Sequence, residues 1–387
     1  MDGGTSALLA TLTRRERAAL RSVMVGAAAR ADVGGDPSLL QAMVPAAPMP
    51  ALPEAARLHR LPGVVLRGLD GVEGVPDEAR RQLASQRDSA AFNHLMTIGN
   101  LSVIARELDA ADVSWVLMKG PVATGLLYRE PGDRVYADID LLVDRRHYGR
   151  AMEVLEALGF GHVIRDWLLA EQMLAGQVEL VNGPMRIDLH WHLHYSREDR
   201  RPFNLDPDAM LARRRTVAVS GLAVPTLDPV DTLMTLAFHA ARSDGHRLMW
   251  SKDLERSLAV EQPDLDELVR RSRAARCAPQ VGVMLRRASV LLGAPVPDDV
   301  VAALCPRGLR LADRAITSVS APIRFDEHQS LARFFTRSVR SSVVASLAAA
   351  PLRSLRSARR RLSPPPPNET DDPIEKASYV RAVAASR

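Results

Sequence analysis

The chain has 387 residues, enough for one large domain or for two or three smaller ones, and its 47% hydrophobic and 25% charged content is ordinary for a globular protein. The formal net charge of +5 is small for this length, so charge alone does not indicate a nucleic-acid partner. Cys277 and Cys305 are the only cysteines, which excludes a disulfide framework. The sequence shows neither a signal-peptide pattern at its start nor an apolar run long enough to span a membrane, so we expect a cytoplasmic protein without a membrane partner.

Helical patterning dominates the first part of the chain. Apolar residues recur at helical spacing over 7–30 and 77–111, whereas 31–55 is rich in Pro, Gly and Ala and predicts loops with short helices. We therefore expect residues 1–95 to form a mainly helical N-terminal region.

Residues 96–200 change to a mixed pattern that predicts a small mixed sheet with helices on one side. The predicted strands are 114–119, 136–143 and 160–165, with a hairpin near 177–194, and the predicted helices are 121–128 and 147–158. Asn182-Gly183 is a tight-turn signal within the hairpin, although Pro184 favours a loop longer than two residues.

The rest of the chain predicts a mainly helical C-terminal region over 201–350, followed by an Arg- and Pro-rich tail over 351–387. The predicted helices are 228–243, 247–260, 264–275, 278–292, 297–304 and 308–319, after one short hairpin at 217–224. The tail carries consecutive prolines after Ser363 and many polar residues, so we expect it to be disordered and dispensable for folding.

The most informative feature is a pair of aspartates in an apolar strand. Asp138 and Asp140 lie two residues apart, so they project from one face of the strand while Ile139 and Leu141 project from the other. Two like charges this close repel each other and are costly to bury unless a cation lies between them. The pair thus indicates a divalent metal site, although a solvated strand face would give the same pattern.

A third carboxylate comes from the predicted hairpin. Asp188 shares a strand face with His190, His192 and His194, opposite an apolar face. A carboxylate on a neighbouring strand is what a two-metal phosphoryl-transfer site needs beside a paired Asp-x-Asp. The alternatives are a salt bridge from Asp188 to an arginine, and a zinc site built on the histidine face.

Two basic residues flank the acidic strand. Lys119 and Gly120 stand where a strand meets a helix, a place that suits an anion, with Lys119 as a point charge and Gly120 allowing close approach of the backbone. Arg134 precedes the acidic strand and is interpreted either as a ligand for a substrate phosphate or as a structural partner of Asp138.

The order of these elements resembles the uncharacterised nucleotidyltransferase family of the DNA polymerase beta-like superfamily. The resemblance covers about residues 96–195, from Lys119-Gly120 through Asp138-Ile-Asp140-Leu-Leu-Val to Ile-Asp188-Leu-His-Trp. A weaker similarity to a helical segment of the family follows at His239, Trp250 and Asp253. The chain departs from the wider superfamily at Gly120-Pro121, where a Gly-Ser or Gly-Gly is usual, and Pro121 has no N–H to offer a phosphate.

The resemblance implies an α+β fold with a small mixed-sheet nucleotidyltransferase-like module between helical regions. It implies transfer of a nucleoside monophosphate from a nucleoside triphosphate, for instance ATP, to a hydroxyl of an unknown acceptor, with nucleic acid possible as acceptor but not indicated. Asp138, Asp140 and Asp188 would bind Mg²⁺ or Mn²⁺ and catalyse, and Lys119, Gly120 and Arg134 would hold the nucleotide. The alternatives are a zinc-dependent hydrolase using His190 and His192, or a non-catalytic nucleotide-binding protein.

Overall fold

A seven-stranded mixed sheet organises the protein in the computed structural model, which describes residues 7–243, 245–325, 331–339 and 371–386. Its strand order is β3-β4-β5-β2-β1-β7-β6. The strands are β1 (Trp115–Leu117), β2 (Ile139–Val143), β3 (Gly161–His162), β4 (Gln177–Asn182), β5 (Met185–His190), β6 (Arg215–Val219) and β7 (Leu222–Thr226). The α+β fold class expected from the sequence is confirmed.

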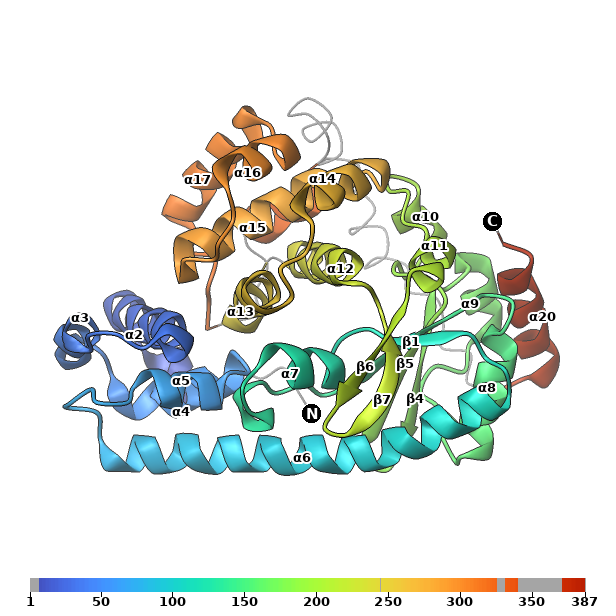
Figure 1. Ribbon diagram of the computed structural model, residues 1–387, viewed down its shortest axis with the longest axis horizontal. Coiled ribbons are helices and arrows are strands. Elements are labelled where there is room, and N and C mark those ends of the chain that lie inside the picture. Colours follow the sequence, from blue (N-terminus) through green and yellow to red (C-terminus); the bar gives the residue numbers. More distant parts are fainter. Residues whose placement is uncertain (1–6, 244, 326–330, 340–370, 387) are drawn as a thin grey trace.

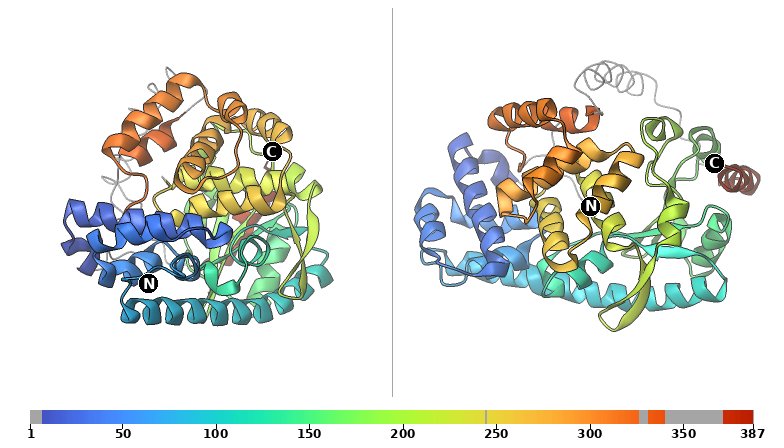
Figure 2. Two further views of the ribbon diagram at one scale, coloured as in Figure 1. Left: turned by 60° about the vertical axis from the view of Figure 1, so that its left-hand side comes forward. Right: turned by 45° about the horizontal axis from the view of Figure 1, so that its top comes forward.

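The N-terminal part of the chain is helical, and its last helix continues past residue 95. Its helices are α1 (Ala7–Thr11), α2 (Arg14–Val33), α3 (Ser38–Met43), α4 (Leu52–Leu58), α5 (Pro62–Gly68) and the long α6 (Asp77–Ala110), with short 3-10 turns at Val44–Ala46 and Met49–Ala51. A capping box between Thr13 and Glu16 fixes the start of α2, since each residue satisfies a backbone N–H of the other. Figures 1 and 2 show α6 running along one edge of the molecule with the other N-terminal helices beside its first half.

The remaining described helices alternate with the strands and then form a C-terminal group. They are α7 (Pro121–Leu127), a 3-10 turn at Pro131–Asp133, α8 (Tyr148–Ala157), α9 (Trp167–Met173), α10 (Arg197–Arg200), α11 (Pro207–Ala212), α12 (Pro229–Arg242), α13 (Leu248–Arg256) with a π-helical turn at Ser257–Glu261, α14 (Leu265–Ala274), α15 (Ala278–Leu292), α16 (Asp298–Leu304), α17 (Arg307–Val319), α18 (Leu331–Ser338) and α20 (Pro373–Ala384). The predicted bounds of α7, α8 and α12 to α17 agree with these to within a few residues, whereas α9, α10 and α11 were not predicted.

The two sheet faces belong to different cores. Leu117, Ile139 and Leu141 pack in a core that includes residues of α6 and α8. Leu142 and Val116 point the other way, into a core shared with α12 and α13. Helices therefore cover both sides of the sheet, not one side as expected, because the C-terminal helices fold back over the second face (Figure 1).

The β4–β5 hairpin is tighter than expected. Asn182 pairs with Met185, which leaves a loop of only Gly183 and Pro184. Gly183 has a φ of 57°, the positive value required at the first loop position of a type II′ turn. The backbone N–H of the second loop position makes no hydrogen bond between the strands of such a turn, so a proline, which has no N–H, is tolerated at position 184.

The expectation of a disordered tail is wrong for its last part. Helix α20 packs against α8 and α9 (Figure 1), and its Tyr379 and Val383 are fully buried. The Tyr379 hydroxyl donates to the carbonyl of Ala175 at 2.6 Å, and the Trp167 indole N–H donates to Asp371 at 2.7 Å. Composition did not predict this helix, because the residues that it packs against lie some 200 residues earlier in the chain. The arginine cluster and the proline run lie outside the described residues.

None of the described helices has the length and apolar character needed to cross a membrane.

Candidate active site

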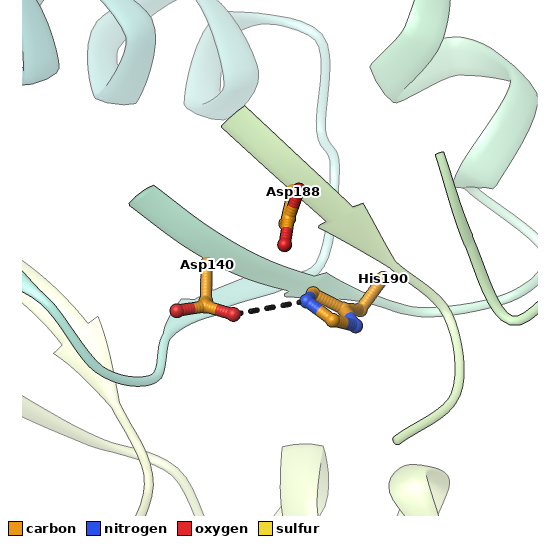
Figure 3. Close-up of side chains that lie close together, drawn as sticks. All are labelled: Asp140, Asp188 and His190. Carbon is orange, nitrogen blue, oxygen red and sulfur yellow. Dashed lines mark hydrogen bonds and ion pairs between the residues drawn. The ribbon is translucent and has the colours of Figure 1, made fainter. Parts of the chain in front are cut away.

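Asp140 and Asp188 face each other across neighbouring parallel strands. β2 and β5 pair in parallel with Asp140 opposite Asp188, so both carboxylates leave the same sheet face. His190 lies two residues beyond Asp188 on β5, and its Nε2 is 3.1 Å from Asp140 Oδ1. Potential ligand atoms of Asp140, Asp188 and His190 all lie within 4.8 Å of one another. Figure 3 shows the three side chains close together. The hairpin predicted from the sequence therefore does bring Asp188 to the acidic strand.

Asp138 lies just before β2 and is half-buried. Its carboxylate is not in the compact group of Asp140, Asp188 and His190, but it lies close enough to Asp140 to interact electrostatically. Burial raises the pKa of Asp138, and the negative charge of Asp140 raises it further. The structure thus places Asp138 at the edge of the group that contains the other two carboxylates.

Lys119 is the cation of this cluster. It follows β1, and its Nζ lies 2.8 Å from Asp140 Oδ1. Burial by itself would raise the pKa of Asp140, but Lys119 and His190 outweigh burial and hold that pKa well below its usual range. Burial would likewise lower the pKa of Lys119, yet Asp140 and Asp138 raise it. Asp140 and Lys119 are thus a charged pair at neutral pH.

Asp188 differs from Asp140 because no cation within the described residues pairs with it. Burial raises its pKa to about 6, and the charges of Asp140 and Asp138 contribute in the same direction against the opposing effect of His190. Its other neighbour is Gln177, whose amide Nε2 donates to Asp188 Oδ2 at 3.3 Å. Gln177 was not singled out in the sequence, although its place across from His190 in the hairpin would have located it.

The residues present fit a divalent cation. Carboxylate oxygens are the ligands preferred by Mg²⁺ and Mn²⁺. The buried Nδ1 of His190 has no hydrogen-bond partner in the described part of the chain, and Asp188 is a half-buried carboxylate beside two others. A bound cation would relieve the repulsion among these carboxylates. The cluster can therefore hold a divalent metal through Asp140 and Asp188, with His190 as a ligand or as the partner that orients Asp140.

Gly120 is required where the chain turns from β1 into α7. It has a φ of 53°, and a Cβ there would lie 2.8 Å from the carbonyl oxygen of Asp138. The turn thus brings the backbone against the start of the acidic strand. Pro121 occupies the first position of α7, where its missing N–H costs no helical hydrogen bond.

Arg134 does not face the carboxylate cluster as a free cation. Its guanidinium is buried and donates to both carboxylate oxygens of Asp253, at 2.8 and 3.0 Å, and also to the carbonyl of Gly120 at 3.4 Å. Tyr128 donates to the same Asp253 carboxylate at 2.6 Å. This network joins α13 to the Gly120 turn. Neither sequence interpretation of Arg134 named Asp253 as its partner, because 119 residues separate the two.

The remaining histidines of the hairpin have other neighbours. His194 is buried between Phe203 and Phe238 and lies 2.7 Å from an Arg242 guanidinium nitrogen. Burial lowers the pKa of His192 to about 3, with a further contribution from Arg200. Within the described residues, His192 and His194 lie outside the group of potential metal ligands. The pair required for the zinc alternative, His190 and His192, is therefore not brought together as a site.

His239 of α12 lies near this cluster of charged residues. It is exposed, whereas its neighbours in α12 from Leu233 to Phe238 are buried. The positive charge of Lys119, followed by desolvation, lowers its pKa well below the usual value. His239 is therefore close enough to Lys119 and Asp140 to interact with both electrostatically. Trp250 of α13 meets its ring edge-on at 5.9 Å between centroids.

A mixed sheet that presents carboxylates from adjacent strands beside a Lys-Gly turn defines a nucleotidyltransferase-like class of protein. The model of the family described as "Uncharacterised nucleotidyltransferase" matches residues 45–293, well over half of the chain, and the protein belongs to that family. The family resemblance drawn from the sequence is thereby confirmed, and the match extends beyond the resembling segment on both sides.

The comparisons with individual proteins add less. A solved structure described as an antigenic nucleotidyltransferase-like protein from Paracoccidioides brasiliensis is similar at 18% identity and a TM-score of 0.34, covering 54% of this chain and 96% of that one. At that score the likeness carries no inference about function. No curated protein matches the chain.

Proposed function

We propose that the protein transfers a nucleoside monophosphate from a nucleoside triphosphate to a hydroxyl group of an acceptor. The observation that carries the proposal is the parallel register of Asp140 with Asp188, with Lys119 at 2.8 Å from Asp140. Family membership supports nucleotidyl transfer as the general reaction. Bound Mg²⁺ or Mn²⁺ would supply charge neutralisation for the phosphates and would lower the pKa of the attacking hydroxyl.

The chain's own residues take distinct parts in this proposal. Asp140 and Asp188 hold the cation, and Asp138 completes the acidic edge. The acceptor oxygen attacks the α-phosphorus, the bond from that phosphorus to the bridging oxygen breaks, and pyrophosphate leaves. Asp188, which faces Asp140 across the two strands, would take the acceptor's proton where it is not itself a ligand of the cation. Lys119 would exchange its contact with Asp140 for a substrate phosphate when a cation neutralises Asp140.

Gly120 and Arg134 have supporting parts in the proposal. Gly120 lets the turn lie against the acidic strand, close to a bound triphosphate. Arg134 holds that turn through the Gly120 carbonyl instead of contacting the substrate, since Asp253 already satisfies its guanidinium. The turn precedes a seven-residue helix that begins with Pro121, so we assign phosphate binding to Lys119 rather than to helix N–H groups.

The direct test is to incubate the protein with each α-labelled nucleoside triphosphate, Mg²⁺ or Mn²⁺, and a cell extract. Pyrophosphate release with transfer of the label to an extract component is the expected result. The matched control is Asp140→Asn, which should give neither. Nucleotide binding without pyrophosphate release would favour the non-catalytic alternative, and stoichiometric zinc with hydrolysis would favour a metallohydrolase.

A further inference from the structure

The outer face of α6 carries an apolar stripe that no other described part of the chain covers. Phe92, Leu95, Met96 and Val103 are exposed at 63%, 59%, 54% and 37% of their surface. Their spacing places them on one side of the helix. In Figure 1 this helix forms the lower edge of the molecule. Single exposed apolar residues are common, but a contiguous stripe of large ones indicates an interaction surface.

The surface of the stripe is shaped so that another helix can approach it closely. Gly99 lies in its middle, and a Cβ built there would meet nothing within 4 Å. Towards the start of the helix, a shallow hollow is lined by Ser85, Asp88, Ser89 and Phe92 among others. A missing side chain and a hollow on one face allow the side chains of a partner helix to insert.

The charges at the two ends of the stripe complement each other under two-fold symmetry. Asp88 and Arg106 are separated by about five helical turns, so both lie on the same side of the stripe. Packing two α6 helices antiparallel about a centre between Met96 and Gly99 would set Asp88 of one copy beside Arg106 of the other, at both ends. The same alignment places Met96 over Gly99 and Phe92 over Val103.

Within the described part of its own chain, each of these charges pairs with an exposed neighbour. Asp88 pairs with Arg87 at 2.8 Å and Arg106 with Glu107 at 3.0 Å, and all four side chains are at least 40% exposed. Exposed pairs of this kind contribute little to stability, so they can rearrange on association.

We propose that two copies of this chain pair through α6, antiparallel and two-fold symmetric, with Phe92, Leu95, Met96 and Val103 in the contact. A two-fold contact of this type uses the same patch on both copies, which matches a stripe whose end charges are complementary to themselves. The inference is independent of the proposed reaction, because it rests on the exposed side of α6 and not on the carboxylate cluster.

The first test is the mass of the full chain in solution, by light scattering coupled to size exclusion across a wide range of concentrations. The expected mass is twice the chain mass of 42.3 kDa. Met96→Glu should give the single-chain mass with an unchanged far-ultraviolet circular dichroism spectrum, because residue 96 is exposed in one copy. Val290→Glu, at a position 72% exposed on α15, is the matched control and should leave the dimer intact. A wild-type monomer, or a dimer unaffected by Met96→Glu, would overturn the proposal.

The second test concerns direction and register. Asp88→Arg and Arg106→Asp should each weaken the dimer, and the two changes together should restore it. A short bismaleimide should link two Met96→Cys chains but not two Arg81→Cys chains, whose residues 81 would be about 50 Å apart in the antiparallel pair. Both native cysteines are buried, which keeps the background low. Linking of Arg81→Cys, or no rescue by the double charge exchange, would exclude the antiparallel arrangement.

Discussion

Asp253 and Arg134 form a buried bidentate ion pair that joins the C-terminal helices to the nucleotidyltransferase-like module. The carboxylate of Asp253 on α13 accepts from Nε and Nη2 of Arg134, which lies in the segment before β2. Because Arg134 also reaches the Gly120 carbonyl, the position of α13 is linked to the turn beside Lys119.

Removing one partner of this pair should destabilise the fold strongly. We expect Asp253→Ala to lower the free energy of unfolding by about 3–5 kcal/mol, because it leaves the buried Arg134 charge uncompensated. Chemical denaturation measures the change. Glu78→Ala, which breaks the exposed pair of Glu78 with Arg81, is the control and should cost less than about 1 kcal/mol. Equal effects of the two substitutions would show that the Arg134–Asp253 pair does not organise the interior.

The two facing aspartates should respond oppositely to neutralisation in metal-free protein. Asp188→Asn should raise the free energy of unfolding near neutral pH by about 1–2 kcal/mol, because burial keeps the pKa of Asp188 raised to about 6. With a folded-state pKa above the unfolded value of 3.8, the charged form of Asp188 destabilises the fold above pH 6, and the penalty disappears as the pH falls towards 4.

Asp140→Asn should lower stability instead, since it removes the carboxylate partner of Lys119 and of His190. Denaturation curves in the presence of a chelator give both values. Calorimetry with Mn²⁺ should then show that each variant has lost metal affinity, whereas Glu179→Gln, on the neighbouring strand β4, should retain it. Two variants with the same stability change would contradict the different environments inferred for the two carboxylates.

Lys119→Ala should weaken nucleoside triphosphate binding more than it weakens the fold. Loss of a charge-assisted contact should cost about 1.5–3 kcal/mol of binding free energy. Equilibrium binding of a labelled triphosphate in the presence of Mg²⁺ measures the effect, and thermal melting of the same sample measures the fold. An unchanged affinity would remove Lys119 from the nucleotide site and leave it as a partner of Asp140 alone.

His59 should make the protein sensitive to mild acid. Its Nδ1 accepts the Leu248 N–H at the start of α13, at 3.1 Å, and burial together with the charges of His246 and Arg247 lowers its pKa to about 3. The unfolded chain binds this proton near pH 6.5 and the folded protein only near pH 3. The free energy of unfolding should therefore fall as the pH drops through that window, by up to about 1.4 kcal/mol per pH unit.

His59→Asn is the control for this pH dependence, because the amide oxygen can still accept from Leu248 but does not titrate. Denaturation at several pH values should show a shallower slope for the variant than for the wild type between pH 6.5 and 3. Identical slopes would mean that other groups cause the acid sensitivity.

The C-terminal helix should contribute to stability. Tyr379→Ala should lower the free energy of unfolding by about 3–5 kcal/mol through the cavity it leaves, and Tyr379→Phe by about 1 kcal/mol through the lost hydrogen bond to Ala175. Ile374→Ala, at an exposed position of the same helix, should have little effect. Equal melting temperatures for all three variants and the wild type would restore the view of a dispensable tail.

The sequence by itself determined the local features on which the site depends. Strand periodicity separated Asp140 from Ile139 and Leu141 in one strand, and Asp188 from Leu189 in another, and helical spacing located many of the helices within a few residues. These patterns are readable because side-chain direction repeats every two residues in a strand and every 3.6 in a helix, whatever the element packs against.

Only the tertiary structure decided which distant groups meet. The register of Asp140 with Asp188, the pairing of Arg134 with Asp253, and the burial of Tyr379 each depend on segments that are far apart in the chain. The different pKa shifts of Asp140 and Asp188 have the same origin. Lys119 forms its ion pair with Asp140, and electrostatic interactions in a low-dielectric interior depend on distances of a few ångströms that no local pattern encodes.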